Sequence, residues 1–229
     1  IRQWKLALLR GAIVTFAQLC FYISLGLMAF ATASTISYAT ALFTTALAIP
    51  ILGERVGWVR WSAVLVGFFG VIMVIQPGAE GFSSYAFFPL AAAVFYALVG
   101  VTARLFDDEV SSAVVNLYSS FSSVVGAALI TYFWGGFSSI TSVTDMIWII
   151  LMGGLGGTAV LLLVVSYRMT EQSNLAPFSY FGIPLSFVLG WLFFNEAPWS
   201  ALFPGGIFIA AGGLLIVWRE RSQAKSNSD

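Results

Sequence analysis

Eight apolar runs of about 20 residues divide this chain, and short polar turns separate them. A helix needs about 20 apolar residues to cross the hydrocarbon core of a bilayer, whereas membrane-spanning β-strands are about half as long and alternate in polarity. The runs cover residues 12–31, 35–52, 58–75, 86–104, 113–134, 146–166, 175–194 and 199–218. The sequence therefore predicts an all-α integral membrane protein with eight transmembrane helices.

Charged and metal-binding residues are scarce. Only 9% of the 229 residues are charged, against about 25% in a soluble domain, so we expect the exterior to contact membrane lipid. The net charge is zero, which gives no reason to expect a nucleic-acid partner. The chain has no histidine, and its single cysteine, Cys20, cannot form an internal disulfide. We expect no metal site and no cofactor.

All ten lysines and arginines fall on one side when the runs are threaded through a membrane in turn. They lie in the segments 1–10, 54–60, 104–111, 168–174 and 219–229. Lysine and arginine in short loops concentrate on the cytoplasmic side of a membrane. We therefore expect both termini in the cytoplasm and an even number of crossings. Residues 1–10 then form an inner loop, and the first outer turn lies at Ala33–Ser34.

The sequence repeats itself weakly at an offset of 142 residues, and the first three predicted helices align without a gap on the last three. The matches include Ser37 with Ser179, Tyr38 with Tyr180, Glu54 with Glu196 and Gly70 with Gly212. Because the first and sixth helices cross in opposite directions, the repeat is inverted and each unit needs an odd number of helices. The second unit has five, so we expect two further helices before Ile1.

The end of the second predicted helix carries a recognisable motif. Leu52-Gly53-Glu54-Arg55 is followed by Gly67 and Gly70, and the second unit has Phe194-Asn195-Glu196-Ala197 followed by Gly205, Gly206, Gly212 and Gly213. With the inverted repeat, this resembles the EamA type of the drug/metabolite transporter superfamily. The resemblance implies a 5+5, ten-helix fold that lacks its first two helices here. It divides the chain into the last three helices of repeat one (1–79), the five-helix repeat two (80–221) and a cytoplasmic tail (222–229).

The resemblance also implies transport of small organic metabolites across the inner membrane, along a pathway between the two units. The predicted helices 12–31, 35–52, 146–166 and 175–194 would line that pathway. Polar residues inside the apolar runs are the candidate substrate-binding residues: Gln18, Tyr22, Tyr38, Thr44, Tyr96, Asn116, Tyr180 and Ser186. Tyr38 and Tyr180 are repeat partners on two pathway helices. The alternative is that these hydroxyls bond a neighbouring helix and the tyrosines anchor the membrane interface.

Three further residues are candidates for gating or for structure. Glu54 and Glu196 end matched helices, where each carboxylate can bond the amides that begin the next helix and be favoured by its dipole. A gating or coupling role is the second reading. Pro184 interrupts the predicted helix 175–194, and carriers use such broken helices at their substrate sites. Pro184 is therefore a candidate hinge.

A transporter of neutral, zwitterionic or aromatic solutes, such as amino acids, is the preferred function, because an unpaired ion is poorly solvated in an uncharged cavity. A lipid or drug flippase or exporter of the same architecture is the alternative, and a channel or a scaffold fits an inverted repeat less well. An enzyme is not expected, since the chain has no histidine and its aspartates lie in loops or the tail. A small-molecule substrate and membrane lipid are the expected partners. Gly153 and Gly157 leave a homodimer as a minor reading.

Overall fold

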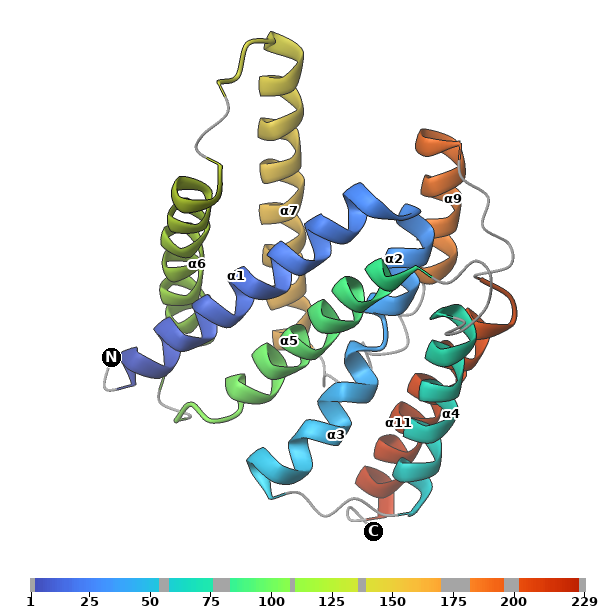
Figure 1. Ribbon diagram of the computed structural model, residues 1–229. Coiled ribbons are helices and arrows are strands. Elements are labelled where there is room, and N and C mark those ends of the chain that lie inside the picture. Colours follow the sequence, from blue (N-terminus) through green and yellow to red (C-terminus); the bar gives the residue numbers. More distant parts are fainter. Residues whose placement is uncertain are drawn as a thin grey trace.

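The computed structural model (Figure 1) describes residues 3–53, 58–75, 83–107, 110–135, 139–169, 182–195 and 202–226, which form helices and turns. The elements are α1 (Trp4–Leu27), α2 (Phe30–Ser37), α3 (Thr40–Leu52), α4 (Trp58–Ile75), the 3-10 turn η1 (Ser84–Ala86), α5 (Phe87–Ala103), α6 (Ser112–Trp134), α7 (Val143–Met169), α9 (Gly182–Phe194), the π-helical turn η2 (Leu202–Gly206) and α11 (Ile207–Ser226). Within these ranges the all-helical prediction is confirmed.

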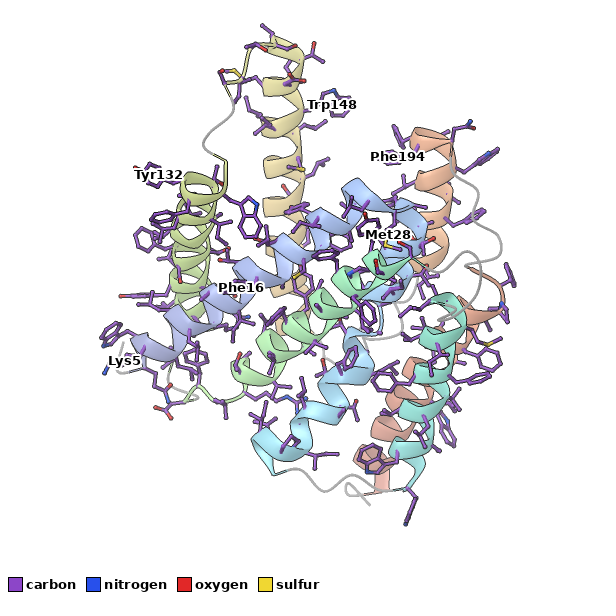
Figure 2. All side chains as sticks on the ribbon, viewed as in Figure 1. Lys5, Phe16, Met28, Tyr132, Trp148 and Phe194 are labelled. Atoms are coloured by element: carbon purple, nitrogen blue, oxygen red, sulfur yellow. The ribbon has the colours of Figure 1, made fainter. Side chains whose placement is uncertain are left out.

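Helices long and apolar enough to cross a membrane account for four of the predicted runs. Among the described residues these are Trp4–Leu27, Phe30–Leu52, Ser84–Ala103 and Ala113–Trp134. Shorter apolar helices overlap the other runs, at Trp61–Ile75, Val143–Ala159, Leu185–Phe194 and Phe203–Leu215. Many large apolar and aromatic side chains are exposed, and Tyr132 points away from the bundle in Figure 2. Such an exterior is suited to lipid rather than to water.

The first helix differs from the prediction at both ends. Residues 1–10 were expected as an inner loop, but α1 begins at Trp4 and carries Arg10 inside the helix. Figure 2 shows Lys5 near its start and Met28 at its far end. α1 ends at Leu27, and Met28 adopts an extended conformation while its amide donates to the Ser24 carbonyl. The charge of the first ten residues is therefore compatible with a helix that enters the membrane.

The predicted turn at Ala33–Ser34 is wrong, because both residues lie inside α2. The next hydroxyl, on Thr35, donates to the Ala31 carbonyl at 2.7 Å, and Ser37 donates to the Ala33 carbonyl at 3.0 Å. A serine or threonine that bonds the carbonyl one turn earlier satisfies its own polarity within the helix. A short polar cluster is thus a poor turn signal here.

Two antiparallel helices, α4 and α11, pack side by side (Figure 1) and meet through glycines. A Cβ atom placed on Gly70 would lie 2.7 Å from the carbonyl oxygen of Gly205. Further along, a Cβ on Gly212 would lie 2.7 Å from the carbonyl oxygen of Ala63. Both distances are too short for a side chain, so glycine lets the two backbones touch, as small residues do between membrane helices. We call this the glycine contact and define it as Gly67 and Gly70 of α4 with Gly205 and Gly212 of η2 and α11.

The largest buried cluster joins α2 and α3 to this helix pair. Ile36, Leu42 and Ile209 have no solvent-exposed surface in the structure, and Val64 and Val71 of α4 pack with them. On the other side of the molecule, α1 lies along α5 and α6 (Figure 1). Every described side chain of α7 is exposed. The core therefore lies beside α2 and α3.

Candidate functional site

The helix that carries Tyr38 is interrupted at that residue. α2 ends at Ser37 and α3 begins at Thr40, so Tyr38 and Ala39 form a turn inside the single span Phe30–Leu52, which contains the predicted run 35–52. Tyr38 and Ala39 have ψ angles of −12° and −9°, which tighten the backbone towards a 3-10 turn. The Ala39 amide donates to the carbonyl three residues earlier at 3.0 Å, and the Thr40 hydroxyl donates to the Ser37 carbonyl at 2.7 Å. A side chain thus helps to satisfy the backbone at the break.

Tyr38 connects this break to the start of α9. Its side chain is half-buried, and its phenol group lies directly against Gly182, the first described residue of α9. A Cβ atom on Gly182 would overlap the Tyr38 hydroxyl and would lie 3.1 Å from the ring carbon Cε1. Only glycine therefore leaves room for this ring. The break in residues 1–79 and the described start of α9 in residues 80–221 are in direct contact.

Two other predicted residues lie on the helices that meet at the break. Ser186 follows Gly182 by one turn on the same face of α9, is buried, and donates to the Ile183 carbonyl at 2.8 Å. The Thr44 hydroxyl of α3 donates to the Thr40 carbonyl at 2.8 Å. The same hydroxyl oxygen would lie 4.0 Å from a Cβ atom placed on Gly100 of α5. Each hydroxyl oxygen keeps the capacity to accept a further hydrogen bond.

The remaining described candidates fall in two other places. Tyr22 of α1 is 55% exposed, and Tyr96 of α5 is half-buried. Gln18 and Asn116 lie in the contact between α1 and α6. The Gln18 oxygen accepts from the Ser123 hydroxyl at 3.4 Å, and the Asn116 oxygen accepts from Arg10 at 3.3 Å. Both therefore bond a neighbouring helix, which is the alternative considered from the sequence.

The other predicted residues give less information. Tyr180, Glu54 and Glu196 lie outside the described residues. Pro184 lies in the first described turn of α9, whose helix continues without interruption to Phe194. Among the residues that the structure describes, no group of three or more cysteine, aspartate and glutamate side chains is placed to hold a metal ion.

Comparison with known proteins supports the resemblance seen in the sequence. Residues 1–76 match the model of the EamA-like transporter family. An S-adenosylmethionine uptake transporter of Rickettsia bellii is 26% identical over 215 residues, which cover 93% of this chain and 72% of that protein. By this family match and by its relatives, the chain is similar to the EamA-like transporters. A riboflavin transporter of Rhizobium johnstonii is 28% identical over 171 residues, covering 74% of this chain and 55% of that protein. A pseudopaline exporter of Pseudomonas aeruginosa is 24% identical over 203 residues, covering 88% and 71%.

Two features of this chain were not expected from the sequence. The first is the contact of Tyr38 with Gly182, for which the glycine itself, two residues after Tyr180, was the available signal. The second is the role of Arg10, which was assigned to a loop because of its charge. Asn116 and Ser119, spaced three residues apart on α6, present two oxygens on one helix face and were the signal for its binding partners.

Proposed function

We propose that this chain is a transporter of the EamA type that carries small organic solutes across the inner membrane and binds them at the break between α2 and α3. The observation that carries the proposal is Tyr38, which stands at the break and contacts Gly182 of α9. Secondary carriers place their substrate sites at discontinuous helices, where two structural repeats meet. Tyr38 meets both conditions. It lies at the break between α2 and α3, and it belongs to residues 1–79 whereas its neighbour Gly182 belongs to residues 80–221.

The proposed solutes are neutral, zwitterionic or aromatic, amino acids and related molecules among them. Tyr38, Thr44 and Ser186 supply hydroxyl groups and an aromatic face, and none of them carries a fixed charge. An isolated ion would lose its hydration at such a place without compensation. Riboflavin, named for one relative, is an aromatic molecule without net charge and supports this solute class. S-adenosylmethionine, named for another, carries a positive sulfonium and would need a counter-charge that these three residues do not supply.

The proposal includes a 5+5 inverted repeat with units 1–79 and 80–221, followed by the tail 222–229. The glycine contact supports it. A Cβ on Gly70 would lie 2.7 Å from the amide nitrogen of Ile209, and a Cβ on Gly212 would lie 2.7 Å from the amide nitrogen of Gly67. The repeat offset of 142 residues relates Gly70 to Gly212 and Gly67 to Ile209. The first contact therefore becomes the second when each residue is replaced by its repeat partner. An internal two-fold axis between antiparallel α4 and α11 would produce this reciprocity.

The orientation and the remaining site residues belong to the same proposal. Both termini lie in the cytoplasm, a placement supported by the ten lysines and arginines that fall on one side. Tyr180 is the second tyrosine of the site, Glu54 and Glu196 act at helix ends in gating, and Pro184 is a hinge near the described start of α9. Tyr22, Tyr96, Gln18 and Asn116 are secondary candidates for contacts with the solute.

Export, including flipping of a lipid or drug, is the second candidate. One observation favours it: the similarity to the pseudopaline exporter covers 88% of this chain. Import and export use the same architecture, and the direction depends on solute gradients and coupling. The transport assay below is therefore run in both directions.

Tyr38→Ala and Tyr38→Phe in proteoliposomes test the site. The solutes are radiolabelled riboflavin, S-adenosylmethionine and a neutral aromatic amino acid, offered inside or outside the vesicles. Tyr38→Phe loses one hydroxyl and should lower the transport rate about fivefold, which corresponds to one hydrogen bond. Tyr38→Ala also loses the ring and should lower the rate roughly tenfold or more.

The matched control is Tyr132→Ala, because Tyr132 is 69% exposed on α6 and points away from the bundle (Figure 2). Tyr132→Ala should transport at the wild-type rate at equal abundance in the vesicles. Counterflow of unlabelled solute separates a carrier from a channel. Wild-type transport by Tyr38→Ala would show that the break does not bind the solute.

A further inference from the structure

Side-chain hydrogen bonds join residues 1–79 to residues 80–221 along the first part of α1. Gln3 precedes α1, donates to the Leu105 carbonyl at 3.4 Å and accepts from the Asp107 amide at 3.2 Å. Ser119 of α6 donates to the Ala7 carbonyl at 3.4 Å. These bonds gather at the end of the bundle where α1 begins, which carries Lys5 and Arg10 and is the proposed cytoplasmic end.

Arg10 makes the most connections in this group. Its Nε atom donates to the Val99 carbonyl of α5 at 3.3 Å. Its Nη1 atom donates to the Asn116 oxygen at 3.3 Å and to the Ser119 hydroxyl at 3.0 Å, both on α6. One half-buried side chain thus bonds two helices across the boundary between the proposed units. Together with the bonds of Gln3, we call these the polar contact.

The position of Arg10 explains how a cation is tolerated there. Val99 lies in the last turn and a half of α5, which ends at Ala103, and the C-terminal end of a helix attracts positive charge. The side-chain partners are neutral oxygens rather than carboxylates. Water or lipid headgroups can replace neutral acceptors one by one, whereas breaking a buried ion pair leaves an uncompensated charge. The polar contact is therefore suited to repeated opening.

We propose that Arg10 is a positioning residue that holds the α1 end of the pathway closed, and that its hydrogen bonds break when this end opens. The inference rests on the proposed transport function, in which two units must separate at one end at a time. The glycine contact would stay closed meanwhile, because backbone atoms of the opposite segment lie 2.7–2.9 Å from the positions that a Cβ atom would take on Gly70, Gly205 and Gly212. Arg10 acts on the solute only through the positions of α1, α5 and α6.

The test measures opening directly, without any solute. Cys20→Ala removes the single cysteine, and Ala7→Cys or Ala63→Cys then places one thiol in the polar or the glycine contact. Ala7 and Ala63 are 0% and 1% exposed, so each thiol reacts with a water-soluble maleimide only when its contact opens. Arg10→Gln should speed labelling of the Ala7→Cys thiol roughly tenfold, the effect expected when a charged hydrogen-bond donor is lost. Labelling of the Ala63→Cys thiol should not change.

Further variants keep the result interpretable if Arg10→Gln folds poorly. Arg10→Lys keeps the charge and should give an intermediate rate, and Asn116→Ala removes one acceptor and should give a smaller increase. Lys5→Gln is the control for loss of charge, because Lys5 is exposed on the same helix. Unchanged labelling in Arg10→Gln, or an equal rise at both thiols, would overturn the proposal. If labelling rises as expected but the wild-type protein transports no solute, the positioning role holds and the transport function is wrong.

Discussion

Two helix contacts in this molecule achieve close packing by different means. In the glycine contact, the nearest neighbours of Gly212 are backbone atoms of α4, and those of Gly70 are backbone atoms of Gly205 and Ile209 together with the Cβ atom of Phe208. Between α1 and α6, a Cβ on Gly11 would also approach a backbone atom, the Ser119 carbonyl oxygen at 2.5 Å, but the side chain of Ser122 lies equally near. The Ser122 hydroxyl donates to the Leu8 carbonyl at 2.9 Å. Close backbone packing and the T-shaped ring pair of Phe69 and Phe208 hold α4 against α11, whereas side-chain hydrogen bonds also join α1 to α6.

The difference matters because lipid gives helices no hydrophobic reason to associate. Close backbone packing and interhelical hydrogen bonds are the two remaining sources of attraction. Backbone packing offers little room for adjustment, since neither helix can rotate a side chain out of the way. Hydroxyls and a guanidinium can exchange partners. We therefore expect substitutions in the glycine contact to cost more stability than substitutions between α1 and α6.

Gly70→Ala and Gly212→Ala should have the largest effects. Each added methyl group would meet backbone atoms at 2.7 Å, so the helices must separate. Overpacking of this kind destabilises by about 1–3 kcal/mol. If an internal two-fold axis relates the two glycines, the two losses should be equal. Thermal melting of the purified variants in detergent measures both losses of stability.

Gly153→Ala provides the control for the intrinsic effect of replacing a helical glycine. A Cβ on Gly153 has no neighbour within 4 Å, and alanine favours a helix over glycine. Stability should therefore stay equal or rise slightly. Unequal losses at Gly70 and Gly212 would argue against the two-fold relation, and no loss at either would show that the glycine contact does not hold the helices together.

Gly126→Ala, between α1 and α6, should cost less. Its added methyl group would lie 2.7 Å from the Thr15 hydroxyl, which is a side-chain atom and can move. We expect a loss of about 1 kcal/mol, at the low end for overpacking. Thr15→Ala should remove the obstacle, so the double variant should recover part of the loss in a double-mutant cycle of melting temperatures. A double variant whose loss equals the sum of the two single losses would show that Thr15 is not the obstacle.

The sequence predicted the elements better than their ends. Length and hydropathy were enough for the apolar runs, because a bilayer imposes both on any helix that crosses it. The glycines that follow the helix-end motif proved to lie at helix contacts, as at Gly67 and Gly70. The end of α1 was misplaced because Ala33 and Ser34 suggested a turn, whereas both lie inside α2, where the Ser37 hydroxyl bonds the Ala33 carbonyl. Local polarity cannot distinguish these cases without the partner atoms.

The candidate site was predictable only in part. Tyr38 was singled out by the repeat, but the break beside it has neither glycine nor proline within Ser37–Thr40 and so leaves no signal in the sequence. The contact of Tyr38 with Gly182 joins residues 144 positions apart, which local sequence does not reveal. Arg10 was assigned to a loop because a cation within a membrane helix is unfavourable. Its acceptors on α5 and α6 are about 90 to 110 residues away in sequence, where no local pattern reveals them.

Ser122→Ala should have the smallest measurable effect. It removes one interhelical hydrogen bond, to the Leu8 carbonyl, and such bonds contribute about 0.6 kcal/mol on average between membrane helices. Ser120→Ala is the matched control, because Ser120 lies two residues away on α6 and is exposed. The difference between the two melting curves isolates the hydrogen bond from the general effect of replacing serine in this helix. If the two variants melt alike, hydrogen bonding adds nothing to the α1–α6 contact, and its stability comes from close packing at Gly11 and Gly126, as in the glycine contact.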